Sequence, residues 1–101
     1  MIAPIATAVV IVTVLVGGTP TSGVRVDVSE GYQHGGTSDG RPPVRRTTNR
    51  HGEVRLSVSD APGDITWVHP YPGGRSDCRA VRINRPPRKR PYDVTISCPA
   101  S

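Results

Sequence analysis

The stretch VTVLVGGTPTSGVRVDV, residues 12–28, sets the expected fold, because it places two alternating apolar segments on either side of a turn. Alternation with a period of two is typical of a strand that buries one of its faces. Pro20 presets the backbone of a turn, and Gly23 suits a tight or left-handed position in it. The stretch therefore predicts two strands, Val9–Val16 and Val24–Val28, joined by a short connection.

The rest of the chain repeats this pattern of short strands separated by turn residues. Eleven Gly and eleven Pro punctuate the 101 residues, and β-branched side chains dominate the segments between them. Such side chains favour a sheet over a helix, and no segment has a helical period. Seven short strands at this spacing predict an all-β sandwich. The five further strands are expected at Val44–Thr48, Glu53–Val58, Ile65–His69, Arg79–Asn84 and Tyr92–Cys98.

The expected core is small and aliphatic, because only 35% of the residues are apolar and Phe is absent. A chain of this length is expected to form one domain over residues 1–101, with one thin core. Trp67, flanked by Ile65 and Val68, is expected to be the largest side chain in that core. The predicted core residues are Val12, Val14, Val16, Val24, Val26, Val28, Val54, Leu56, Val58 and Trp67.

The two cysteines, Cys78 and Cys98, flank the last two predicted strands and are candidates for a disulfide in an oxidising compartment. Two reduced, buried thiols are the alternative. If the cysteines lie directly opposite each other in one hairpin, Val81 and Ile83 point away from the apolar side of the other strand. A bulge would remove this conflict, and so would placing the two strands in different sheets. The sequence leaves both solutions open.

Residues 1–18 have two interpretations. The apolar run is as long as a signal-peptide core, and Val16, Gly17 and Gly18 resemble a small-residue cleavage site. No basic residue precedes Arg25, however, and the run is rich in β-branched residues, so we favour a buried first strand over a signal peptide. The run is also shorter than the roughly 20 apolar residues of a transmembrane helix, so no membrane span is expected.

Two segments of the chain resemble carboxypeptidase-regulatory-like, or transthyretin-like, domains. Residues 12–28 match the first strand of that family, its Gly-x-Pro-x-x-Gly turn and its second alternating strand. Residues 47–58, TTNRHGEVRLSV, are similar to a second hallmark, a Thr and a turn with Gly before an alternating strand. The resemblance implies a seven-stranded antiparallel Greek-key sandwich of Ig-like architecture. It also implies an accessory or adhesive module without chemistry.

The residues themselves point to neither catalysis nor metal binding. Ser38, within Gly36–Gly40, matches the Gly-x-Ser-x-Gly nucleophile pattern, but that motif needs a following helix, which Pro42 and its neighbours forbid. The three His are not spaced as a ligand set, and the acidic turn at Asp60–Asp64 has too few ligands for a calcium loop. We therefore expect no catalytic residue, no metal and no cofactor.

The net charge of +5 comes from thirteen basic residues, of which only Lys89 is not Arg. They are scattered over several segments, so a solvated surface is the main interpretation and a nucleic-acid partner is disfavoured. One concentrated group lies between the last two strands and is a candidate contact for a polyanion or a partner, although a solvated turn that prevents edge-to-edge aggregation is the alternative. This group is Arg85, Arg88, Lys89 and Arg90, with Tyr92 beside it.

These features predict a non-catalytic structural or binding protein, in one of two settings. The first is an accessory component of a larger assembly, such as a capsid-decoration or minor tail protein of a phage. It would be made in the cytoplasm and would contact capsid or tail proteins at the virion surface, where sandwich edges can pair with a neighbour. The second is an extracellular binding domain, secreted or on the cell surface, whose partner is an anionic host-surface glycan.

Overall fold

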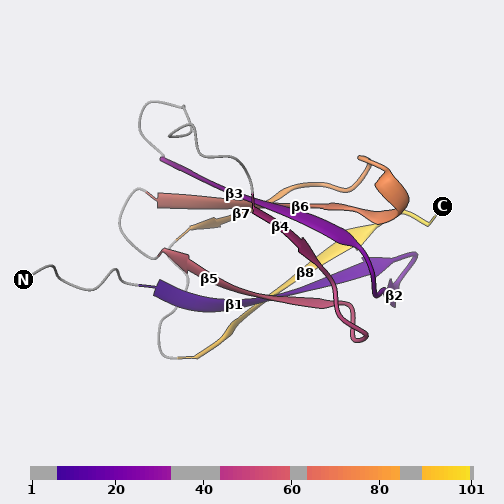
Figure 1. Ribbon diagram of the computed structural model, residues 1–101, viewed down its shortest axis with the longest axis horizontal. Helices are drawn as coiled ribbons and strands as arrows, with labels where there is room; N and C mark the ends of the chain where they lie inside the picture. The colour runs from indigo at the N-terminus through magenta and orange to yellow at the C-terminus, as the bar shows by residue number, and fades with distance from the viewer. Residues whose placement is uncertain (1–6, 33–43, 60–63, 85–89, 101) are drawn as a thin grey trace, which may run out of the picture.

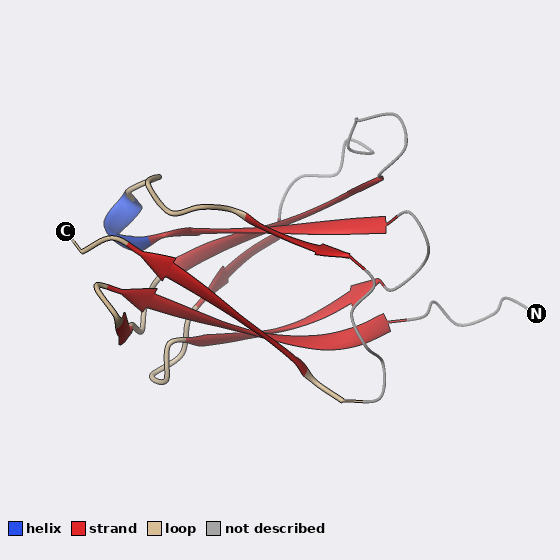
Figure 2. Cartoon of the chain, turned by 180° about the vertical axis from the view of Figure 1, so that it is seen from behind, coloured by secondary structure: helices blue, strands red, loops and turns tan. Residues whose placement is uncertain are grey.

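The computed structural model of the chain describes residues 7–32, 44–59, 64–84 and 90–100. Within these residues the chain is mostly strand, with one short 3-10 turn (Figure 2). The all-β class predicted from the sequence is therefore confirmed. The strands are β1 (Thr7–Val16), β2 (Thr19–Pro20), β3 (Arg25–Tyr32), β4 (Val44–Thr47), β5 (Glu53–Ser59), β6 (Asp64–Tyr71), β7 (Val81–Asn84) and β8 (Tyr92–Cys98), and the 3-10 turn is η1 (Pro72–Gly74).

One sheet, called sheet A below, is built around the first strand. β5 pairs with β1 in antiparallel orientation along Thr7–Thr13, and β2 pairs with the last two residues of β1. β8 pairs with β1 in parallel orientation, so the first and last strands of the fold lie side by side. This parallel pair is a correction to the purely antiparallel sandwich that we expected. A hairpin must be antiparallel, but β1 and β8 are separated by most of the chain and carry no such constraint.

The second sheet, called sheet B, contains four antiparallel strands in the order β4-β3-β6-β7. In Figure 1 its strands β3 and β6 lie above β1 and β5 of sheet A, which gives the two layers of a sandwich. β6 extends two residues beyond the predicted end at His69, through Pro70 to Tyr71. Since β7 pairs only with Ile65–Val68, the β7 side of Pro70 is open, and a residue without an N–H is tolerated there.

The conflict between the last two predicted strands is resolved by their placement in different sheets. β7 pairs with β6 in sheet B, whereas β8 pairs with β1 in sheet A. Ile83 of β7 and Ile96 of β8 are therefore both buried, each from its own side of the sandwich. All seven predicted segments contain a strand, and within the described residues the two-residue β2 is an eighth.

The core lies between the two sheets and is made largely of Val, as the composition requires. Val16 and Val28 are only partly buried but pack against it. Among the predicted core residues, the buried ones are Val12, Val14, Val24, Val26, Val54, Leu56 and Val58. Alternation along β1, β3 and β5 therefore identified the inner face of each strand correctly.

Trp67 is the exception, because its side chain is 43% exposed and lies outside the core. In β6 the inner positions belong to Thr66, Val68 and Pro70, all of which are buried. Trp67 lies at one of the positions that alternate with these residues, so its side chain faces outward. The prediction that Trp67 fills the core is wrong, because β6 carries apolar residues at both parities and alternation alone cannot assign its faces.

The two segments that carried the family resemblance meet at one corner of the sandwich. Thr48 is only 4% exposed, and its Oγ1 accepts a hydrogen bond from the Val24 N–H at 2.9 Å and donates one to the Thr21 carbonyl at 2.7 Å. Gly52 has φ +75°, and a Cβ there would lie 2.7 Å from the Thr21 nitrogen. A close approach of this kind at positive φ admits only Gly.

Candidate functional site

Most of the predicted basic group lies outside the described residues. Arg85, Arg88 and Lys89 fall in the gap before residue 90, so their role as a polyanion contact stays a prediction. Arg90 and Tyr92 are described and exposed, and Tyr92 is 42% exposed at the start of β8. Ser38 of the rejected nucleophile pattern also lies outside the described residues.

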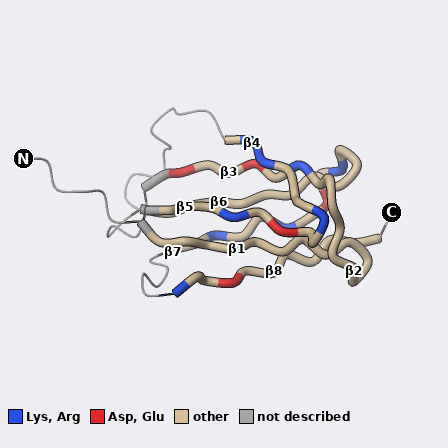
Figure 3. The backbone as a smooth tube through the Cα atoms, turned by 60° about the horizontal axis from the view of Figure 1, so that its bottom comes forward, with Lys and Arg blue, Asp and Glu red and all other residues tan. Residues whose placement is uncertain are grey.

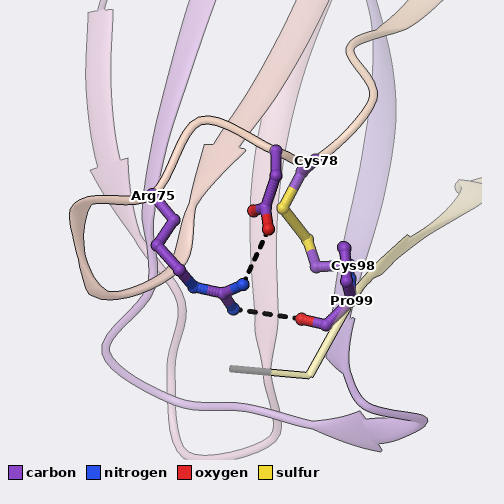
Figure 4. A network of polar contacts seen from close by, with 5 residues as sticks. Arg75, Cys78, Cys98 and Pro99 are labelled. Carbon is purple, nitrogen blue, oxygen red and sulfur yellow. Dashed lines mark hydrogen bonds and ion pairs between the residues drawn. A yellow bond between two sulfur atoms is a disulfide. The ribbon is translucent and has the colours of Figure 1, made fainter.

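The predicted disulfide is present and ties the two sheets together. Cys78, between η1 and β7, is bonded to Cys98 at the end of β8, with a Cα–Cα distance of 4.8 Å (Figure 4). Beside it, Arg75 Nη1 contacts Asp77 Oδ2 at 2.8 Å, and Arg75 Nη2 donates to the Pro99 carbonyl at 3.0 Å. Disulfides are typical of oxidising, extracellular settings.

The outer face of sheet B brings together side chains from all four of its strands. Strand register places Ser29 and Arg82 directly beside Trp67, and places Asp27 between Arg45 and His69. The next row pairs Arg25 with Tyr71. We call this surface the Trp67 face and define it by Arg25, Asp27, Ser29, Arg45, Trp67, His69, Tyr71 and Arg82.

Ion pairs and ring contacts order one half of the Trp67 face. Arg25 Cζ lies 4.4 Å from the centroid of the Tyr71 ring, a cation–π distance, and the His69 and Tyr71 rings form a T-shaped contact with 4.3 Å between their centroids. Arg25 Nε and Arg45 Nε lie 3.3 Å and 3.5 Å from Asp27 Oδ1. His69 Nε2 donates to the Cys78 carbonyl at 2.8 Å, which links this face to the disulfide.

These contacts leave the face positively charged. It carries three Arg against a single carboxylate, Asp27, whose side chain is only 16% exposed and already contacts two of the three. Arg45 remains 66% exposed, and Arg82 is exposed beside Trp67. Figure 3 shows that basic segments occur on strands of both sheets, so charge alone does not single out this face. The feature that distinguishes the Trp67 face is the exposed indole of Trp67 among the arginines.

A groove of about 340 Å³ lies where β4 of sheet B and β5 of sheet A approach the same open edge of the sandwich. Val28, Val44 and Leu56 supply its apolar lining, and its charged lining residues are Arg46, Arg55 and Glu30. Within the described residues, β4 and β5 are each the outermost strand of their sheet at this edge. The groove can therefore accept an extended chain, because edge strands present unpaired backbone groups.

The part of the chain that the structure describes contains no cluster of three or more His, Cys, Asp or Glu that could hold a metal ion. It also contains no helix that is both long enough and apolar enough to cross a membrane. On the Trp67 face, Asp27 contacts two arginines, and His69 contacts a backbone carbonyl through Nε2, whereas its Nδ1 is buried without a hydrogen-bond partner among the described residues.

Sequence reasoning missed the Trp67 face. The alternation of Arg25 and Asp27 with buried Val residues was enough to place these two side chains on an outer face. Their neighbours on β6 and β7 could not be found in this way, because they depend on the register between strands distant in the chain. The one indication in the sequence was that apolar residues occupy both sets of alternating positions around Trp67, so that one set had to face outward.

No family model matches the chain, and neither a curated protein nor a solved structure matches it. The resemblance to carboxypeptidase-regulatory-like domains therefore stays a prediction.

Proposed function

We propose that this protein is a non-catalytic binding module, secreted or displayed at a cell surface, and that it binds its partner through the Trp67 face. The observation that carries the proposal is the 43% exposure of Trp67 in the middle of a four-stranded sheet, beside Arg82. Trp, Tyr and Arg are the residues that most often dominate binding energy at interfaces. Aromatic residues and Arg are also enriched at protein interfaces relative to the rest of the surface.

The setting of Trp67 also favours binding over chemistry. It sits on a strand that is paired on both sides, so the ring is presented by a rigid scaffold. Its cross-strand neighbours are Ser29 and Arg82, and the nearest groups with acid–base chemistry are already engaged in contacts. The disulfide supports an oxidising compartment. The two-layer arrangement supports our further proposal of a Greek-key, Ig-like or transthyretin-like topology.

Retention on the surface of cells from the protein's source tests this proposal. Labelled protein carrying Trp67→Ser should lose retention, because the substitution removes the exposed ring without opening the core. Tyr92→Ser is the matched control, since Tyr92 is an equally exposed aromatic on the other sheet, at 42%. Loss of retention with Tyr92→Ser but not with Trp67→Ser would overturn the proposal and point to the basic group beside Tyr92.

A second candidate function is an accessory component of an assembly, such as a capsid-decoration or minor tail protein. The groove between β4 and β5 favours it, because a neighbouring subunit can add a strand at such an edge. Co-sedimentation with particles of its source is the expected result. A purified protein that stays monomeric and never sediments with those particles contradicts this candidate.

A further inference from the structure

We infer that the ligand of the Trp67 face is an anionic polysaccharide. The indole of Trp67 stacks on a sugar ring, and Arg82 and Arg45 bind carboxylate or sulfate groups of the same chain. This inference rests on the proposed function and names the ligand class of that site.

The charge of the face selects an anionic ligand. Asp27 is the single carboxylate among the residues that define the face, and Arg25 and Arg45 already contact it. Arg82 is exposed and forms no ion pair with any described residue. An arginine presents a planar fork of donors that matches a carboxylate or a sulfate in geometry as well as in charge.

The spacing of the cations suits a chain with a charge on more than one sugar ring. Arg82 is directly opposite Trp67, so their Cβ atoms are about 5 Å apart by sheet geometry. Arg45 lies two strands away from Trp67 on the other side and one row along. The spacings of a β-sheet put their Cα atoms about 12 Å apart. The indole therefore lies between two positive charges.

The aromatic residues favour a sugar over a nucleic-acid base. Proteins that bind single-stranded nucleic acid stack successive bases on several free rings. Here Trp67 is the exposed ring, whereas Tyr71 is covered on one face by Arg25 and also contacts the His69 ring. One free indole fits the apolar C–H face of a pyranose, whose partly positive hydrogens are attracted to the ring.

A second copy of the chain does not fit the face. A twofold contact would place the same patch on both subunits, and here it would bring Arg25, Arg45 and Arg82 against their own copies. Like charges facing each other oppose such an interface. An acidic protein surface would satisfy the charges, and the experiment below separates it from a polysaccharide.

Tryptophan fluorescence tests the inference directly, because Trp67 is the single Trp of the chain. Heparin as the sulfated probe and polygalacturonate as the carboxylated probe are titrated into the intact protein, with dextran as the neutral control. Saturable changes in the emission of Trp67 are expected with at least one anionic probe and none with dextran. The affinity should fall as salt is added, because exposed ion pairs are screened. Comparison of the two anionic probes shows which charged group is preferred.

Two matched variants distinguish a site from general attraction to a basic protein. Arg82→Gln should weaken binding about five- to tenfold, the loss expected for one hydrogen bond at an exposed site. Arg50→Gln makes the same charge change in the exposed turn between β4 and β5, outside both the Trp67 face and the groove, and should leave the affinity unchanged. Equal weakening by both variants would overturn the inference.

An unchanged emission of Trp67 with both anionic probes would also overturn it. The cell-retention experiment then shows whether the proposed function falls with it. If Trp67→Ser still abolishes retention, the face binds another class of partner, such as an acidic protein, and only the ligand class is wrong. If the Trp67→Ser variant is retained on the cells as well as the wild type is, both the proposed ligand class and the proposed binding face are wrong.

Discussion

Replacement of Thr48 by Val is expected to destabilise the fold far more than its small change in shape suggests. Thr and Val have nearly the same volume, so the substitution removes the hydroxyl and leaves the packing of this buried position intact. The Thr48 hydroxyl accepts from the Val24 N–H at 2.9 Å and donates to the Thr21 carbonyl at 2.7 Å. Both bonds join the corner after β4 to the connection before β3.

The magnitude follows from the burial of the two partners. Val24 is buried, so its N–H cannot form a hydrogen bond to water instead. A buried donor without an acceptor lowers the free energy of unfolding by about 1–3 kcal/mol. Thr21 is only half-buried, so its carbonyl can be hydrated and contributes about 0.5 kcal/mol. We expect Thr48→Val to lower the free energy of unfolding by about 2–3 kcal/mol, which lowers the Tm of a domain of this size by roughly 10–20 °C.

Denaturant-induced unfolding of Thr48→Val, followed by circular dichroism, measures this loss. Thr47→Val is the matched control, because Thr47 is the preceding residue, carries the same side chain and is exposed. It should change the free energy of unfolding by less than about 0.5 kcal/mol. If Thr48→Val were as mild as Thr47→Val, the corner would not be held by these two bonds and the reasoning would be refuted.

Three further predictions concern the frame of the sandwich. Removing the disulfide with Cys78→Ala should lower the free energy of unfolding by about 3 kcal/mol in the chain-entropy model, and reductant should have the same effect on the wild type but none on the variant. Gly52→Ala should lower the free energy of unfolding by at least about 2 kcal/mol, because its Cβ would lie 2.7 Å from the Thr21 nitrogen. Gly18→Ala is the control, since Gly18 has φ +85° but no atom within 4 Å of the added Cβ, and it should lower the free energy of unfolding by about 1 kcal/mol. Denaturant unfolding measures both values. The intact mass of the protein from its source should include Thr7–Val16, because this strand is the centre of sheet A. A mass that lacks the first eighteen residues would contradict a structural first strand and support a signal peptide.

Much of the secondary structure could be predicted from the chain, because strand alternation is a local property. Every second residue of a half-buried strand faces the core, so the inward direction of Val12 and Val26 can be predicted from their own strands without knowing which strand pairs with them. The same holds for Val54 and Leu56 on β5. The turn before β5 also follows from local chemistry, since Asn49 Oδ1 accepts hydrogen bonds from the backbone N–H groups of nearby residues.

The pairing of strands that are distant in the chain was beyond this reasoning. β7 and β8 are consecutive, and the sequence left open whether they form a bulged hairpin or lie in different sheets. They belong to different sheets and are joined through Cys78 and Cys98. The parallel contact of β1 with β8 has no local signal either. In both cases the arrangement depends on which apolar faces can be buried together, and that is a property of the whole chain.

The sequence by itself therefore determined an all-β protein with a Val-rich core, its principal strands and the two cysteines that can bond. Only the tertiary structure decided that Trp67 lies outside the core and among arginines. The physical reason is the register between β3, β6 and β7, which sets Ser29 and Arg82 beside Trp67 and turns all three toward solvent. Side-chain direction along a strand is local, but a binding face is assembled from strands that meet only when the chain has folded.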